Sequence, residues 1–419
     1  MKGRRVTEET LQHGTDSPRS RPDRLLHNRD FLLFLFSRGN AVTANHVLAV
    51  ALGWHVYERT GDVWNLGLIG LFMFLPVLSL FLFAGLAADR LDRRLIVGIC
   101  NAAHCVATLA IGAYLMTGSE TIWPVFGLLL VTGSAQAFLH PALLATLPNI
   151  VPREIFAHAV ATMSSVNKLA QLGGPAIGGL LIALIDEGVY VVAGGLFLLA
   201  ALAAFLIRAN LRVTGKEPFG LTVILGGFSH IWRTKPVLAA ISIDLVAVLF
   251  GGIMGLLPVF AIDILKVGPE VLGVMRAMPA AGALVVALML ARSGLPWSVG
   301  RTFFVSLTIF GLSILVFSVS TSFWLSLAAL AVYGASDMVS VYVRQTLVQT
   351  ETPNELRGRV SAVNSVSINA SNQLGDFRAG GMAALIGAPA AVALGAGITL
   401  AATALWFRWF PELRAVERF

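Results

Sequence analysis

Five polar or charged residues interrupt long apolar stretches of the sequence: Arg38, Gln136, Lys168, Asp244 and Asp337. An ionisable side chain in a hydrocarbon layer costs at least about 2.5 to 3.5 kcal/mol on insertion scales, so it usually faces a cavity or a partner. Arg38 and Asp244 each lie about seven residues inside their stretches, roughly 10 Å deep at 1.5 Å per helical residue. Their opposite charges at matching depth predict a pair, which either fixes helix packing or takes part in proton exchange.

Carboxylates in such surroundings can carry protons. Low polarity favours the protonated form and a nearby Arg favours the ionised form, so one group can alternate as its surroundings change. Asp244 and Asp337 are the candidates for this chemistry. Lys168, near the middle of its stretch, either recognises a carboxylate or catecholate of a bound compound or makes a structural hydrogen bond. Three further charged residues also lie in apolar stretches, but their positions in the sequence indicate no particular function: Arg276, Asp376 and Arg378.

The stretches that hold these residues are long enough to cross a membrane. The chain has 419 residues, of which 56% are hydrophobic and 13% charged, and its mean hydropathy is +0.78. These values are typical of a polytopic membrane protein. A helix of about 20 apolar residues crosses a hydrocarbon core of roughly 30 Å. The sequence predicts an all-α fold with twelve such helices, over residues 30–53, 65–88, 95–117, 122–146, 157–185, 189–208, 237–262, 270–292, 302–318, 322–347, 360–386 and 388–410.

Lys and Arg in the short loops predict the orientation of these helices. If the N-terminus lies inside, the first 29 residues and most Lys and Arg residues of the loops lie on the same side of the membrane. The loops on the other side contain few cations besides Arg59 and Lys266. Because loop cations are retained in the cytoplasm, both termini are expected there, in a bacterial inner membrane. Residues 1–29 are expected to be a disordered basic arm. The net charge of +7 then reflects topology and does not indicate nucleic-acid binding.

The chain contains an internal repeat. A shift of 201 residues superimposes VPREI on TPNEL and places Gln136 over Asp337, and a shift of 206 in the earlier part places Arg38 over Asp244. Parallel six-helix repeats build one large class of secondary transporters, with a site near the midplane between the halves. We therefore predict two pseudo-symmetric six-helix bundles at residues 30–208 and 237–410, a cytoplasmic linker with an amphipathic segment at 209–236, and a cytoplasmic tail at 411–419.

The connection between the second and third predicted helices, AGLAADRLDRRLIVG, resembles a loop motif of the major facilitator superfamily. The matching residues are Gly85, Asp89, Arg90, Arg93 and Arg94, and Asp92 stands where the pattern prefers Gly. The resemblance implies that the Asp and Arg form a cytoplasmic latch between the halves. Asp89 could face the positive N-terminal end of the eleventh predicted helix, where Arg357 and Arg359 lie. The alternative is that the arginines only enforce topology.

Nearly the whole chain is similar to the branch of this superfamily that contains the enterobactin exporter and the macrolide-efflux transporters. In the fifth predicted helix, Gly174, Pro175, Gly178 and Gly179 resemble the end of a motif associated with antiporters, although tight packing alone would use the same residues. The resemblance implies a monomeric secondary transporter among membrane lipids. It would export a small amphipathic compound, such as a siderophore or drug, by alternating access in exchange for protons.

An importer or a lysophospholipid-type translocator on the same fold is the main alternative. An integral membrane enzyme is not supported, because the sequence has no metal-ligand cluster, no nucleophile with a plausible base and no phosphate-binding glycine loop. Cys100 and Cys105 have neither a metal-ligand nor a useful disulfide spacing. No cofactor or metal is therefore expected.

Overall fold

The helices of the first part of the chain begin at polar capping residues. In the computed structural model, which describes residues 25, 27–119, 121–209 and 228–417, the side chains of Asn28, Asp62 and Asp92 accept hydrogen bonds from the first-turn N–H groups of three helices. These helices are α2 (Arg29–Thr60), α3 (Val63–Arg90) and α4 (Arg93–Leu115). They are followed by α5 (Trp123–Ile150), the short η1 (Arg153–Ile155), α6 (Phe156–Ile185), η2 (Asp186–Gly188) and α7 (Val189–Phe205).

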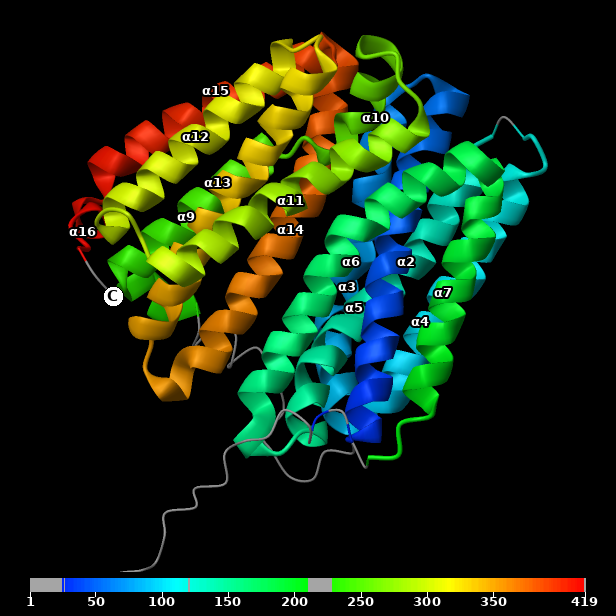
Figure 1. Ribbon diagram of the computed structural model, residues 1–419, viewed down its shortest axis with the longest axis horizontal. Helices are drawn as coiled ribbons and strands as arrows, with labels where there is room; N and C mark the ends of the chain where they lie inside the picture. The colour runs from blue at the N-terminus through cyan, green and yellow to red at the C-terminus, as the bar shows by residue number, and fades with distance from the viewer. Residues whose placement is uncertain (1–24, 26, 120, 210–227, 418–419) are drawn as a thin grey trace, which may run out of the picture.

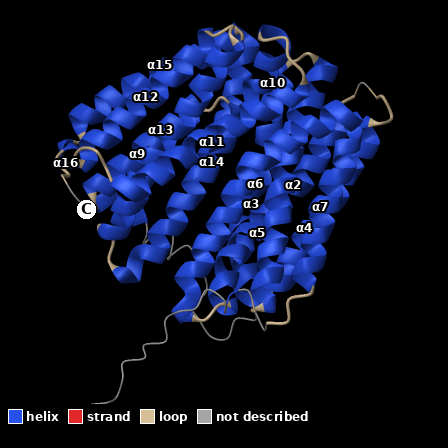
Figure 2. Cartoon of the chain, viewed as in Figure 1, coloured by secondary structure: helices blue, strands red, loops and turns tan. Residues whose placement is uncertain are grey.

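The second part of the chain is also helical. It contains α9 (Lys235–Gly251), the short η3 (Met254–Leu256), α10 (Leu257–Val259) and η4 (Phe260–Ile264), then α11 (Pro269–Ser293), α12 (Val299–Val319), α13 (Phe323–Thr350), α14 (Asn354–Ile386), α15 (Ala388–Trp409) and α16 (Pro411–Arg414). Helices account for nearly all of the described residues, and none of these residues forms a strand (Figure 2).

Nine helical segments of the described chain are long and apolar enough to cross a membrane, and one of them, 156–205, holds both α6 and α7. The long helices α2 and α14 are not among the nine, although they have 32 and 33 residues. Each contains five charged residues, and α14 also contains four Asn and four Ser. A helix that borders a polar space tolerates such residues, so their composition fits a place beside the gap between the two parts of the molecule.

The long helices form two groups that lie side by side (Figure 1). In the first group α2 packs between α6 and α7, and α5 packs between α3 and α4. In the second group α12 packs against α13 and α15, and α9 packs against α14 and α15. The main contacts between the groups are those of α3 with α14 and of α6 with α11, and α2 also contacts α10 and α11.

The seventh predicted helix is not continuous, which corrects the expectation for residues 237–262. The α-helix ends at Gly251, Gly252 adopts an extended conformation, and a short 3-10 turn, one α turn and a π turn follow. Two adjacent glycines lower helix stability, and Pro258 removes a backbone donor. The break leaves backbone groups near residue 254 for other partners.

The regions outside the two groups are only partly described. Of the predicted basic arm, residues 1–24 and 26 lie outside the described residues, as do 210–227 of the predicted linker and 418–419 of the predicted tail. Residues 228–233 are helical. Lys235 binds Glu412 of α16 at 2.8 Å, which fastens the end of the second group to the start of α9.

Candidate functional site

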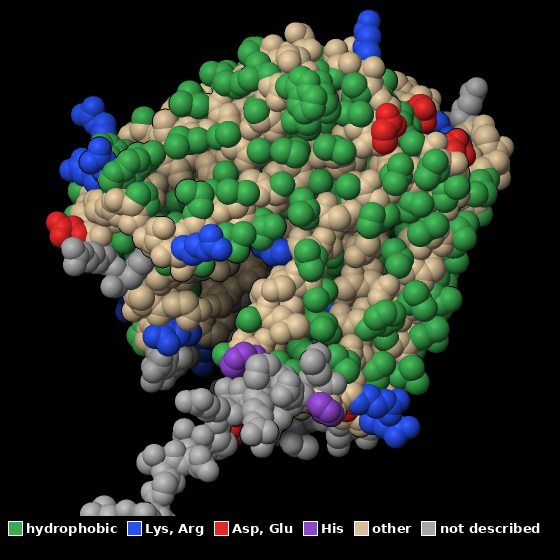
Figure 3. Space-filling model, in the orientation of Figure 1, with side chains coloured by type: hydrophobic (Ala, Val, Ile, Leu, Met, Phe, Trp, Pro, Cys, Tyr) green, Lys and Arg blue, Asp and Glu red, His purple; other side chains and the backbone are tan. Residues whose placement is uncertain are grey.

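The two ends of the helix groups differ in charge. We call the end where α2 begins the basic end; it carries Arg29, Arg94 and Arg357. We call the end where α2 finishes the acidic end; it carries Asp62, Glu187 and Asp263. The groups meet at the acidic end, and Figure 3 shows the surface hollowed between them toward the basic end.

Asp244 forms an ion pair with Arg344 of α13. The two residues are 3% and 2% exposed, and Ser340 also donates to Asp244 at 3.4 Å. The predicted pairing of Asp244 with Arg38 is therefore wrong in this conformation, because Asp244 is already paired within its own group. Arg38 is half-buried on α2 and makes no hydrogen bond or ion pair with another described residue. Removing one partner of such a buried ion pair strongly destabilises the fold, because the other charge is left buried and unpaired.

Asp337 lies two helical turns before Arg344 on α13 and is half-buried. Unlike Asp244, it has no hydrogen-bond or ion-pair partner among the described residues. The charges of Asp244, Arg344 and Lys168 all act on it. Lys168, on α6 of the other group, is exposed and donates to Gln171 of its own helix at 3.1 Å. Gln136 is half-buried, and its Oε1 atom has no partner among the described residues.

A second charged pair lies beside the break in the seventh predicted helix. Arg276 of α11 donates from Nη2 to the Met254 carbonyl at 3.1 Å, and the Gly255 N–H donates to Asp376 of α14 at 3.1 Å. Backbone groups released by the break are thus satisfied by two half-buried charged side chains. Discontinuous helices near the midplane commonly form the binding sites of secondary transporters.

Arg276 and Asp376 line a cavity of about 210 Å³ between the groups. Their charges interact, but no direct ion pair joins them, and Arg276 Nε has no partner among the described residues. The first group contributes Asn45 and Thr132 to the lining, together with apolar residues of α2, α3 and α5. The cavity therefore offers a guanidinium, a carboxylate and neutral polar groups inside an apolar wall.

The contact between α6 and α11 depends on two glycines near the acidic end. A Cβ atom added to Gly179 would lie 2.8 Å from Gly273 Cα, so the backbones cross without room for a side chain. Within the first group, Gly174 packs on His46 and Gly178 packs on Val47, both on α2. The antiporter-like motif, which includes the buried Pro175, thus lies where α6 packs against both α2 and the other group.

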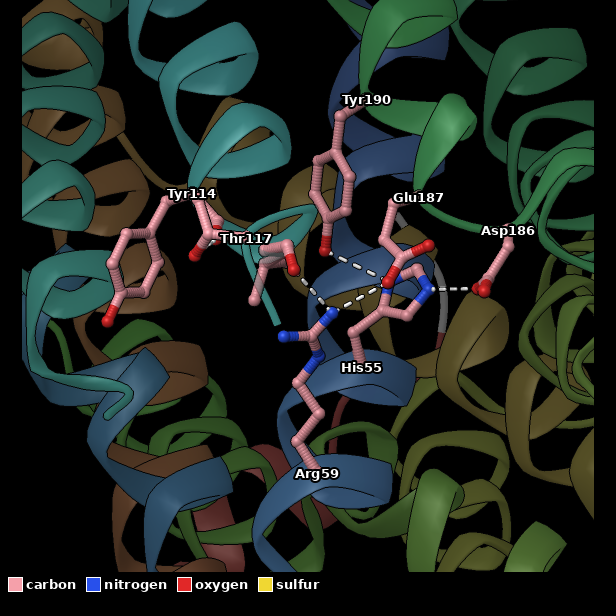
Figure 4. Close-up of polar contacts among 8 residues, drawn as sticks. His55, Arg59, Tyr114, Thr117, Asp186, Glu187 and Tyr190 are labelled. Atoms are coloured by element: carbon pink, nitrogen blue, oxygen red, sulfur yellow. Dashed lines mark hydrogen bonds and ion pairs between the residues drawn. The ribbon is translucent and has the colours of Figure 1, made fainter. Parts of the chain in front are cut away.

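The last turns of α2 hold the acidic end together. His55 and Arg59 are four residues apart, so they share a face of the helix. His55 binds Asp186 at 2.9 Å and Tyr190 at 3.1 Å, and Arg59 binds Glu187 at 2.6 Å, which ties α2 to η2 and α7 (Figure 4). Tyr57 points the other way, about 200° around the helix from His55.

Tyr57 donates a hydrogen bond to Asp263 of η4, in the second group. Among the described residues this is the only side-chain hydrogen bond that joins the two groups. Substitution Tyr57→Phe keeps the ring and removes this bond. Hydrogen bonds to charged groups are worth about 1.5 to 3 kcal/mol, so we expect the acidic end to open roughly 10- to 100-fold more often.

The opening can be measured as a distance distribution by electron paramagnetic resonance, with spin labels placed by Glu58→Cys and Glu270→Cys. The control is Tyr114→Phe, which removes a bond from Tyr114 to the Thr121 carbonyl within the first group. An unchanged distribution in Tyr57→Phe, or an equal change in the control, would show that Tyr57 does not hold the groups together.

Three of the predicted latch residues make contacts within their own groups. Arg93 donates to the Ala145 carbonyl at 2.7 Å, Arg94 binds Asp92 at 2.8 Å, and Arg357 donates to the Thr352 carbonyl at 3.1 Å. The remaining members are Gly85, Asp89, Arg90 and Arg359: Gly85 is buried, Arg90 is exposed, Arg359 is half-buried, and the Asp89 side chain lies outside what the structure describes. Asp92 caps α4, which explains an Asp at the position where the motif prefers Gly.

Comparison with known proteins decides the family. Residues 31–375 match the sequence pattern of the Major Facilitator Superfamily. The chain belongs to this superfamily. It is 28% identical to the multidrug efflux pump Tap of Mycolicibacterium fortuitum over 84% of this chain and 88% of the relative. It is 24% identical to the enterobactin exporter EntS of Shigella dysenteriae serotype 1, over 88% and 89% of the two chains.

Solved structures agree with this assignment at the level of the fold. A bacterial homologue of the human lysosomal transporter Spinster, in an inward-facing and unoccupied conformation, matches with a TM-score of 0.74 and 14% identity, over 92% of this chain and 98% of that chain. This superfamily member is therefore a multi-pass membrane transporter with efflux relatives, and it is not an enzyme. The resemblance predicted from the loop motif and the helix sequences is confirmed.

Sequence reasoning missed three features of the site. Arg344 was overlooked although it lies seven residues after Asp337, on the same face of one helix. Arg276 and Asp376 were recognised as intramembrane charges but not brought together, because their sequence separation of about 100 residues carries no contact signal. Tyr57 gave no signal, since a tyrosine near a helix end is common at membrane surfaces.

Proposed function

We propose that this transporter exports a small amphipathic compound, a siderophore or a drug, across the bacterial inner membrane in exchange for protons. In this proposal twelve helices form two pseudo-symmetric six-helix bundles, residues 30–208 and 237–410, and both termini are cytoplasmic. The observation that carries the proposal is the cavity lined by Arg276 and Asp376 between the two groups. It places a guanidinium, a carboxylate and neutral polar side chains within largely apolar walls, as an amphipathic substrate requires.

The proposed alternation uses the two ends of the helix groups. The basic end faces the cytoplasm by the positive-inside rule, so the conformation described above is open inward. Closure at the basic end would bring the α3–α4 connection, with Asp89, toward Arg357 and Arg359 and form the latch there. Opening at the acidic end would break the Tyr57–Asp263 bond and separate the glycine crossing of α6 and α11.

Proton exchange is proposed to use Asp337. Its side chain is half-buried and has no fixed partner among the described residues, whereas Asp244 is held by Arg344. In this scheme Asp244 and Arg344 set the electrostatic surroundings of Asp337. Lys168 and Arg38 supply positive charge from the other group, and Gln136 offers a neutral hydrogen-bonding group at the repeat position of Asp337.

Substrate binding can be tested in inside-out membrane vesicles with enterobactin, erythromycin and ethidium as probes. We expect uptake of at least one probe into the vesicles, which corresponds to export from the cell. Arg276→Gln and Asp376→Asn should each weaken the apparent affinity for that probe by roughly 10- to 100-fold, because each removes a charged hydrogen-bonding group worth about 1.5 to 3 kcal/mol.

The matched control is Arg292→Gln, which removes an exposed arginine of the same helix. Melting temperatures measured in parallel separate loss of binding from loss of folding. Movement of the probes only in the opposite direction would favour an importer, and unchanged affinity in both cavity variants would place the substrate elsewhere.

A further inference from the structure

An apolar groove on the flank of the first group is separate from the gap between the groups. Its volume is about 990 Å³, near the upper end of the roughly 300 to 1,000 Å³ that small-molecule sites occupy. The groove runs over α2 between α6 and α7. Its lining includes Leu32, Phe36, Leu169 and Ile177, all of which are exposed.

The groove lies on the outer side of α6. Lys168 and Gly179 are about 20° apart around this helix, on the face that turns toward α11. Gly173 and Ile177 of the groove lie about 140° and 180° from Lys168 around the same helix. The groove therefore faces away from the other group, in the position where a membrane protein meets lipid.

The mouth of the groove carries positive charge at the basic end. His27 and Arg29 both line it there, and Arg29 is exposed. The neighbouring Asp30 forms no ion pair with Arg29, and its carboxylate oxygens instead accept from the backbone N–H groups of Arg208 and Ala209 at 3.0 and 2.9 Å. Farther in, Asn40 and Thr43 donate to carbonyl groups of their own helix, so they leave the wall apolar.

The length of the groove and the charge at its mouth together indicate which ligand it can bind. From Arg29 to Thr43 the groove follows α2 for about 21 Å at 1.5 Å per residue, which exceeds half of a hydrocarbon core of roughly 30 Å. A head group at Arg29 would thus leave room for an extended acyl chain along the whole wall. We propose that the groove binds one anionic phospholipid of the leaflet at the basic end, with its phosphate at Arg29 and an acyl chain over Gly173.

Gly173 provides a steric test that does not depend on charge. A Cβ atom added there would meet only Ile177 Cδ1 at 4.0 Å, so a larger side chain would extend into the groove without disturbing the helix packing. Gly127 of α5 is a matched control, because it is an exposed helical glycine in the same group with nothing within 4 Å of an added Cβ.

The experiment is native mass spectrometry of the delipidated full chain, titrated with phosphatidylglycerol and, separately, with phosphatidylcholine. Arg29→Gln is expected to weaken phosphatidylglycerol binding roughly fivefold, as expected for one cation near an anionic lipid surface, and to weaken phosphatidylcholine binding less, because the choline group offsets the charge of its phosphate. Gly173→Leu should abolish the tightest binding event for both lipids. Arg208→Gln and Gly127→Leu should match the unmodified protein.

Two results would overturn the proposal. Equal affinity of the unmodified protein for the two lipids would remove the role of Arg29. A tightest binding event that persists in Gly173→Leu would place the lipid outside the groove. Neither result depends on the direction of transport or on the substrate, so this test is independent of the proposed function.

Discussion

Replacing Arg344 by Gln is expected to lower the free energy of unfolding by about 3 to 5 kcal/mol, the usual cost of leaving a buried charge without its partner. Asp244 is 3% exposed, and its other partner is the weak hydrogen bond from Ser340 at 3.4 Å. Without Arg344 its carboxylate must stay charged in apolar surroundings or bind a proton. The measurement is the melting temperature of the purified protein in detergent.

The double variant Asp244→Asn with Arg344→Gln distinguishes a pair effect from loss of packing. The double variant replaces both charges by neutral amides, so we expect it to regain most of the unfolding free energy that Arg344→Gln alone loses. Arg292→Gln, on an exposed part of α11, should leave the melting temperature unchanged. If the double variant is as unstable as the single one, the side chain of Arg344 stabilises the fold by packing and not by pairing.

Replacing Asp337 by Asn is expected to abolish the accumulation of substrate driven by a pH gradient. For exchange of one proton per substrate molecule, one pH unit supplies about 1.36 kcal/mol, enough for a tenfold concentration ratio across the membrane. An amide cannot carry the proton, so the ratio should fall to about one, whereas downhill movement of the same probe should persist. The measurement uses proteoliposomes with imposed pH gradients and records substrate and proton movement together.

The control for this experiment is Asp62→Asn, which removes an exposed carboxylate at the acidic end. It should retain coupled transport. Asp244→Asn tests the other proton candidate directly: if this variant loses coupling while Asp337→Asn retains it, the roles proposed for the two carboxylates are reversed. Retention of coupling in both variants would place the proton pathway on other groups.

Much of the helical organisation could be predicted from the sequence, because apolar runs and polar caps are local signals. The expected helix at 189–208 corresponds to α7 at Val189–Phe205, and the one at 302–318 to α12 at Val299–Val319. The break after Gly251 was not predicted, although Gly251, Gly252 and Pro258 are visible in the sequence. In an apolar run such residues are compatible with either a continuous or a broken helix, and contact with α14 decides between them.

The site was less predictable than the helices, because pairing between distant helices depends on their rotation. Asp244 was expected to face Arg38, since the internal repeat places the two at matching positions. The rotation of α9 and α13 instead brings Asp244 to Arg344, whose own repeat position in the first group is Leu143. A repeat in sequence therefore conserves helix positions without conserving which side chains meet.

The two groups differ in one mechanical respect. Helix α2 is unbroken over 32 residues, a length of about 48 Å, whereas its counterpart in the second group is interrupted between Gly251 and Met254. A continuous helix of this kind acts as a rigid lever, so a tilt at Arg38 is transmitted undiminished to Tyr57. The interrupted segment acts as a compliant joint and absorbs strain locally. We therefore expect a tilt of α2 to be carried along the whole helix, whereas a tilt of α9 is absorbed at the break after Gly251.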